Sequence, residues 1–121
     1  MKITTAKVFA LILFIIFSGM MLLYLWIGKL GSENLQADKL LSLQINAQDA
    51  LEQKRPDLAL KYFDKALKTL GDSNDKARAA VFHEGRGLAL SGLKRCPEAQ
   101  KEWKEACQLG RQEACKRTCS P

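Results

Sequence analysis

The sequence has few of the residues on which most catalytic centres depend. Its 121 residues include one histidine, and no two of its four cysteines stand in a C-x-x-C arrangement. That histidine, His83, is followed by Glu84 but forms no metal or protease motif, and a packing or capping role is favoured. Gly85-x-Gly87 lacks the following glycine and the strand of a phosphate-binding loop. We therefore expect no enzyme, no catalytic residue, no cofactor and no small-molecule substrate.

The four cysteines are poorly spaced for a structural zinc site. Such sites usually pair their ligands roughly two to four residues apart, and only Cys115 and Cys119 come near that spacing. An even number of cysteines in a small domain is more typical of disulfides formed in an oxidising compartment. We therefore predict no metal, and we expect the soluble part of the chain outside the cytosol.

The chain also lacks β patterns, low-complexity tracts and a concentrated basic region. The formal net charge is +6, but basic and acidic residues are interleaved along the predicted helices, as on a solvated face. A mild basic patch at Lys94, Arg95, Arg111, Lys116 and Arg117 is explained more simply by cations near helix ends. The composition favours an all-α protein that binds no nucleic acid.

Charge is absent from one long stretch near the N-terminus. Residues 8–27 read VFALILFIIFSGMMLLYLWI, and twenty residues of helix span about 30 Å, the thickness of a bilayer core. The run is longer than the about 7–15 apolar residues of a cleaved signal peptide and lacks a convincing cleavage site. Tyr24 and Trp26 suit a membrane interface. We predict a cytosolic N-terminus at 1–7, a transmembrane signal anchor at 8–28 that holds the chain in the lipid bilayer, and a linker at 29–34.

A buried core helix is the less favoured interpretation of this stretch, because nothing downstream is large enough to bury it. The positive charges before and after the run differ little in number, so the positive-inside rule barely orients it. The cysteines orient it instead, since disulfides require that the C-terminal part face the periplasm or the cell exterior.

An internal repeat with an offset of forty residues organises the rest of the chain. KRPDLALKYFDKAL and KRCPEAQKEWKEAC, which begin at Lys54 and Lys94, share five identical positions, and Phe63 and Trp103 agree in type. Two alanines flank each aromatic residue at helical spacing, so the three side chains share one face. Such a helix is built to pack closely against another. The alanines are Ala59, Ala66, Ala99 and Ala106.

This Ala-x3-aromatic-x2-Ala pattern resembles the second helix of a tetratricopeptide repeat (TPR). Ala47 and Gly87 match the small residue expected where the two helices of a repeat touch. The offset of forty exceeds the family's period of about 34, and the extra residues fit at 71–76. The resemblance implies two hairpins of a TPR-like α-solenoid and a short C-terminal capping helix within 35–119. The chain departs from the family's usual side chains at Leu43, Asn46, Pro56, His83, Arg86 and Cys96.

Breakers and caps divide this region into five helices. Pro56 and Pro97 fit the first turns of the second and fourth helices, where a missing N–H costs nothing. Gly71 is a typical C-terminal cap, and Ser73 or Asn74 is suited to cap the third helix. The expected helices are about 35–53, 56–70, 74–91, 96–109 and 111–116.

Residues 106–115, ACQLGRQEAC, are similar to the SEL-like branch of these repeats. There the pattern carries a disulfide across a helix corner, which implies a Cys107–Cys115 bond. Of the three possible pairings, this one leaves Cys96 for Cys119. A turn at residues 110–111 is compatible with the first bond, because it sets 107 and 115 at equal heights on antiparallel helices. The second requires the chain to unwind after about Lys116 and to fold back along the fourth helix.

The resemblance also implies a binding function. Hairpins of this family form a concave groove, lined by their first helices, which receives a peptide or a helix of a partner protein. We predict a membrane-anchored protein–protein interaction scaffold with an apolar, neutral groove for a partner in the cell envelope. A structural or assembly subunit of a larger membrane complex and a thiol or redox accessory protein remain alternatives. The predicted groove residues are Leu41, Gln44, Gln48, Leu51, Val81, Glu84, Leu88 and Ser91.

Overall fold

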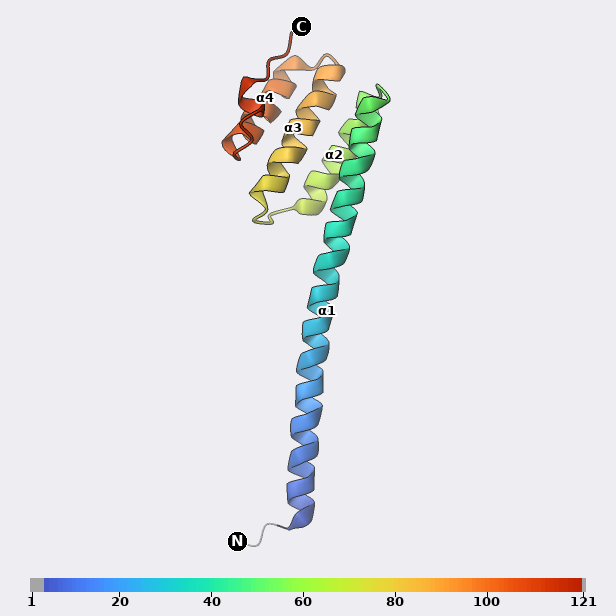
Figure 1. The fold of residues 1–121 in the computed structure, drawn as a ribbon, viewed down its shortest axis with the longest axis vertical. Helices are drawn as coiled ribbons and strands as arrows, with labels where there is room; N and C mark the ends of the chain where they lie inside the picture. The colour runs from blue at the N-terminus through green and yellow to red at the C-terminus, as the bar shows by residue number, and fades with distance from the viewer. Residues whose placement is uncertain (1–3, 121) are drawn as a thin grey trace. The chain divides into compact units, whose positions relative to one another are not determined.

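All regular structure is helical in residues 4–120, the part of the chain that the computed structural model describes. The predicted all-α class is therefore confirmed for these residues. Of the predicted cytosolic segment 1–7, residues 1–3 lie outside the described residues. The chain divides into two compact units, Met1–Ala37 and Asp38–Pro121. The elements are α1 (Thr5–Glu52), α2 (Pro56–Leu70), α3 (Lys76–Gly92), α4 (Cys96–Gln108) and the 3-10 turn η1 (Ala114–Lys116) (Figure 1).

The first unit is the apolar part of α1. Residues 8–27 are exposed along the whole stretch, and α1 is the one helix among the described residues that is long and apolar enough to cross a membrane. A helix satisfies every backbone polar group internally, as the bilayer interior demands. The length and composition of this unit fit the predicted span at 8–28.

The predicted linker at 29–34 is helical, because α1 runs through it to Glu52, and the boundary between the two compact units lies just beyond it, after Ala37. Glycine lowers helix stability by about 1 kcal/mol relative to alanine, but Gly28 and Gly31 leave every backbone donor in place. No proline precedes Pro56, so nothing interrupts the ladder of backbone hydrogen bonds. The Ser32 hydroxyl turns back onto the helix and donates to the Lys29 carbonyl at 2.9 Å. A short polar segment without a true helix breaker therefore remains helical.

Helix α3 lies at the centre of the second unit, between α2 and α4 (Figure 1). A Cβ at Gly85 would overlap the ring of Phe63 from α2, and a Cβ at Gly87 would overlap the ring of Trp103 from α4. Both rings are almost fully buried, at 2% and 4% exposure. The alanines beside the two rings are fully buried too. The face predicted from the repeat is thus the face that packs.

The C-terminal part of α1 covers the other side of this core. Leu40, Leu43, Ala47 and Ala50 are buried in one cluster with Phe63. Their spacing of three and four residues puts them on a single helical stripe. The residues on the opposite face of this part of α1 are exposed, so no described residue packs on that face.

The helices end where the predicted helix breakers and caps place them, except that a different residue caps the start of α3. Gly71 closes α2 with φ 55°, a conformation that glycine adopts without strain. The cap of α3 is Asp75 rather than Ser73 or Asn74, because Asp75 Oδ1 accepts a hydrogen bond from the Arg78 N–H at 3.0 Å. A carboxylate both satisfies that donor and complements the positive end of the helix.

Two disulfides close the C-terminal end: Cys107–Cys115, which the SEL-like resemblance implies, and Cys96–Cys119, the pair that it leaves. The Cα atoms are 4.9 Å apart in Cys107–Cys115 and 5.4 Å apart in Cys96–Cys119. The predicted capping helix at 111–116 is shorter than expected, because the tight corner at Cys107–Cys115 leaves room only for η1. The backbone of Arg117 is extended, so the chain unwinds where the second bond requires it.

Candidate binding groove

A hollow between α1 and α3 is lined by five of the eight predicted groove residues. It has a volume of about 190 Å³, and Gln48 and Leu51 line it from α1. Val81, Glu84 and Leu88 line it from α3. Residues three and four apart share one face of a helix, so each helix presents one stripe to the hollow. The ring of Phe63, which rests on Gly85, also lines it.

A second hollow lies where α1 turns into α2, beside the end of α3. It has a volume of about 450 Å³ and is lined by Leu51, Lys54, Pro56, Leu88 and Gly92. Leu51 and Leu88 line both hollows, which makes the two hollows neighbours along one surface. We call this surface the groove. Its shared centre is apolar, and Lys54 adds a cation at one end.

The other three predicted residues line neither hollow. Leu41 is 57% exposed on the face of α1 turned away from the core. Gln44 is half-buried on the same helix. Ser91 is covered by the C-terminal segment, because its Oγ lies 3.3 Å from Cys119 Sγ. Five of the eight predicted residues thus line the first hollow and three line neither hollow, and their role in binding stays a prediction.

The C-terminal segment contributes groove residues that the spacing rule missed. Arg111, Glu113 and Arg117 line the first hollow together with Glu84. In the first hollow the two cations and two carboxylates balance, and Lys54 in the second hollow leaves the groove as a whole with one more cation than carboxylates. The edge along the C-terminal segment is therefore charged rather than apolar. The sequence signal for this contribution was the Cys96–Cys119 pairing, which requires the C-terminus to fold back along α4. The pairing does not indicate which face of the domain Arg117 reaches.

Glu84 holds this segment against α3. Its side chain is 7% exposed, and it accepts hydrogen bonds from Arg111 Nε at 2.6 Å and Arg117 Nε at 2.9 Å. Burial by itself raises the pKa of a carboxyl group. The hydrogen bonds and charges of the two arginines outweigh burial and hold the pKa of Glu84 below its usual value. Glu84 is therefore ionised at neutral pH and pairs with both arginines.

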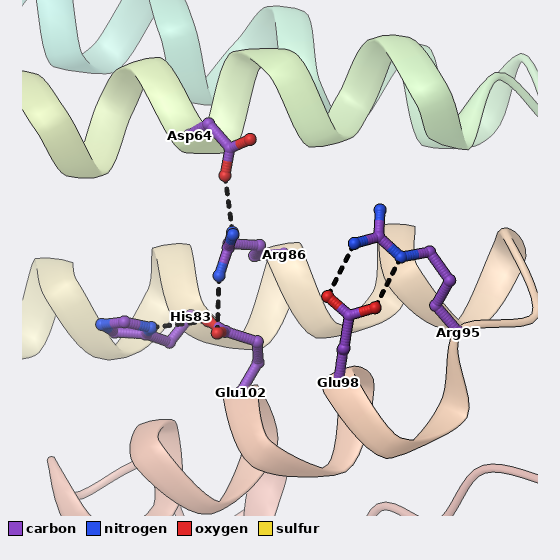
Figure 2. A network of polar contacts seen from close by, with 6 residues as sticks. All are labelled: Asp64, His83, Arg86, Arg95, Glu98 and Glu102. Carbon is purple, nitrogen blue, oxygen red and sulfur yellow. Dashed lines mark hydrogen bonds and ion pairs between the residues drawn. The ribbon is translucent and has the colours of Figure 1, made fainter.

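A second ionic cluster joins α2, α3 and α4 (Figure 2). Arg86 of α3 donates to Asp64 of α2 and to Glu102 of α4, both at 2.6 Å, and His83 Nδ1 lies 2.8 Å from Glu102. Burial raises the pKa of Glu102, but the hydrogen bond with His83 and the charge of Arg86 outweigh it and lower that pKa. His83 and Arg86, which depart from the family pattern, thus connect helices through a buried carboxylate.

The two buried carboxylates predict a loss of stability in acid. A carboxyl whose folded-state pKa is depressed stabilises the fold above its unfolded pKa, here about 4.5, and this stabilisation is lost as the pH falls through the folded pKa. Glu84→Gln should remove part of this pH dependence of stability. It should also lower the free energy of unfolding by about 1–3 kcal/mol at pH 7, because two arginines lose a charged acceptor.

The measurement is the melting temperature of the full chain in detergent between pH 7 and pH 3. The matched control is Glu105→Gln, because Glu105 is exposed on α4 and has no ion pair among residues 4–120, so the pH profile should be unchanged. Equal pH profiles for Glu84→Gln and the wild type would contradict the role given to Glu84.

Comparison of this chain with family models, with curated proteins and with solved structures finds no match. The TPR resemblance therefore stays a prediction that rests on the forty-residue repeat. The groove has to be interpreted from its own residues: an apolar centre at Leu51 and Leu88, with Glu84 and two arginines along one edge. These are residues suited to contact a polypeptide side chain and its backbone.

Proposed function

We propose that this chain is a membrane-anchored scaffold whose helical domain binds a peptide or helix of a partner protein in the groove. The observation that carries the proposal is the pair of neighbouring hollows that share Leu51 and Leu88. A partner side chain would bury its apolar surface against these leucines. The guanidinium groups of Arg111 and Arg117 retain N–H donors beyond those used by Glu84, and these donors suit backbone carbonyls of the bound segment.

We further propose that the second unit consists of two TPR-like hairpins. The C-terminal part of α1 with α2 would form the first hairpin, and α3 with α4 the second. Ala47 is fully buried and Gly87 lies under the Trp103 ring, so both positions have the small residue that close helix contact requires. Phe63 and Trp103 occupy equivalent positions at the forty-residue offset, and each rests on a glycine of α3.

The proposed location is outside the cytosol, with the apolar part of α1 as an uncleaved anchor. Among the described residues all four cysteines are in disulfides, which persist in oxidising compartments. A thiol or redox accessory role is not favoured by this pairing, because a disulfide sulfur carries no thiolate.

The topology proposal predicts the behaviour of reporter fusions. A reporter that is active only outside the cytosol, fused after the last residue of the chain, should be active. The same reporter fused before residue 1 should be inactive. The physical reason is that residues 8–28 cross the bilayer once. A silent C-terminal fusion together with an active cytosolic reporter at the same position would overturn this orientation.

The groove itself is tested by photocrosslinking in cells. A photoreactive residue at Leu88, or at Gln48, should capture a discrete partner, because both positions line the first hollow. The matched control is Gln100, which is exposed on α4 and should capture nothing specific. Equal capture from Leu88 and Gln100 would contradict binding in the groove.

The same experiment separates the scaffold from a structural subunit held through its membrane helix. Residues 8–28 are replaced by an unrelated apolar sequence of the same length. A scaffold keeps its crosslink at Leu88, because the partner is bound by the groove. A subunit joined through the membrane helix loses it.

A further inference from the structure

Two large apolar side chains of the second unit are exposed side by side on α1. Leu41 and Ile45 are 57% and 48% exposed, and from residue 38 to residue 120 no other large hydrophobic residue is exposed to this degree. They stand four residues apart, so they are neighbours on the helix surface. They point away from the stripe that contains Leu40, Leu43 and Ala47 and packs into the core.

The internal repeat shows what covers this surface elsewhere in the chain. At an offset of forty residues, Leu41 and Ile45 correspond to Val81 and Gly85. Val81 packs against the core, and the Phe63 ring of α2 lies on Gly85. A helix therefore covers this position in the second copy, whereas no described residue covers Leu41 and Ile45 in the first. Leu41 and Ile45 mark the open end of the helical stack.

The occupant of this open end is not a helix with an aromatic residue like Phe63. The contact between Phe63 and Gly85 needs a residue without a side chain, and the first copy has Ile45 instead. The side chains of Leu41 and Ile45 form a ridge on this surface. A partner has to receive that ridge between its own side chains, as ridges pack into grooves at helix contacts.

Acidic residues define the charge of this partner. With about 100° between successive residues, Asp38, Asp49 and Glu52 lie within about 40° of Ile45 around the helix axis, whereas Lys39 lies about 120° away. All three carboxylates are exposed. No ion pair is found for any of them among residues 4–120. A second copy of this face would oppose carboxylates to carboxylates, and an anionic membrane surface would be repelled by them.

We propose that this face of α1 docks an amphipathic helix of a partner protein whose apolar residues are flanked by lysine or arginine. We call it the outer face and define it by Leu41, Ile45, Asp38, Asp49 and Glu52. Leu41 and Ile45 supply the apolar contact, and the three carboxylates pair with the flanking cations. The outer face is distinct from the groove between α1 and α3, so the chain has two docking surfaces.

Two synthetic helical peptides test the proposal. Both carry the same leucine and alanine positions, and the flanking positions are lysine in one and glutamate in the other. The full chain is embedded in nanodiscs of zwitterionic lipid, and peptide binding is followed by fluorescence anisotropy with empty nanodiscs subtracted. The lysine peptide should bind the wild type at least tenfold more tightly than the glutamate peptide.

Two variants of the outer face should change peptide binding in different ways, one through the apolar contact and one through charge. L41Q/I45Q should weaken binding of the lysine peptide at least tenfold. D49K/E52K should reverse the preference, so that the glutamate peptide binds more tightly than the lysine peptide. All four positions are exposed, so both variants should melt like the wild type. Leu35→Gln, which changes a 73% exposed leucine in the first unit, is the matched control and should bind as the wild type does.

Several results would overturn the proposal. One is equal binding of the two peptides, and another is lysine-peptide binding that L41Q/I45Q leaves unchanged. Self-association in detergent that L41Q/I45Q abolishes would assign the outer face to a second copy of the chain instead. Leu88→Ala, in the groove, should not affect peptide binding, so failure of the outer face and failure of the groove are distinguishable.

Discussion

Replacing Trp103 with alanine should lower the free energy of unfolding of the helical domain by about 3–5 kcal/mol, the usual cost of truncating a buried aromatic residue. The Trp103 ring is 4% exposed and lies on Gly87. Because Gly87 has no side chain that could move into the vacated space, the cavity stays open. The truncation also removes the indole N–H, which donates to the Glu84 carbonyl at 3.3 Å.

A domain of this size has a total stability of about 5–15 kcal/mol, so the loss is a large part of the whole. Each kcal/mol shifts the melting temperature of such a domain by about 4–8 °C. Far-UV circular dichroism of the full chain in detergent, with the disulfides oxidised, measures the effect. Trp103→Phe keeps a ring and should cost less. A melting temperature for Trp103→Ala within a few degrees of the wild type would contradict this placement.

Removing the Cys96–Cys119 bond should destabilise the domain more than removing Cys107–Cys115. The two bonds close loops with sequence separations of 23 and 8 residues. In the chain-entropy account these lengths correspond to about 3.4 and about 2.5 kcal/mol, since a longer closed loop removes more freedom from the unfolded chain. C96S/C119S also releases the segment that holds Arg117 beside Glu84, which adds to its cost.

The comparison uses C96S/C119S and C107S/C115S in parallel, so each variant is the control for the other. Chemical denaturation of the full chain gives the two losses in free energy of unfolding. A non-reducing digest with mass spectrometry checks the covalent pairs first. A linked peptide that carries Cys96 and Cys107, or four free thiols in protein from an oxidising compartment, would refute the pairing.

Features that depend on neighbouring residues in the chain could be predicted from the sequence. The run at 8–27 is recognised from its length and its lack of charge, and the alanines around Phe63 and Trp103 follow one helical period. Pro56 and Gly71 act on the backbone of their own turn, which is why the bounds of α2 agree with the prediction. The helical state of the predicted linker at 29–34 was not anticipated, because its residues weaken a helix but do not break one.

The sequence by itself determined the apolar helix, the repeated helical faces and the cysteines available for pairing. These features depend only on the residue types and on their spacing along the chain. Only the tertiary structure decided which charges meet in the groove. Glu84 lies 27 and 33 residues from the arginines that hold it, and no local pattern encodes that encounter. Its partners are set by how α3, α4 and the C-terminal segment pack, since an ion pair depends on separation in space and not along the chain.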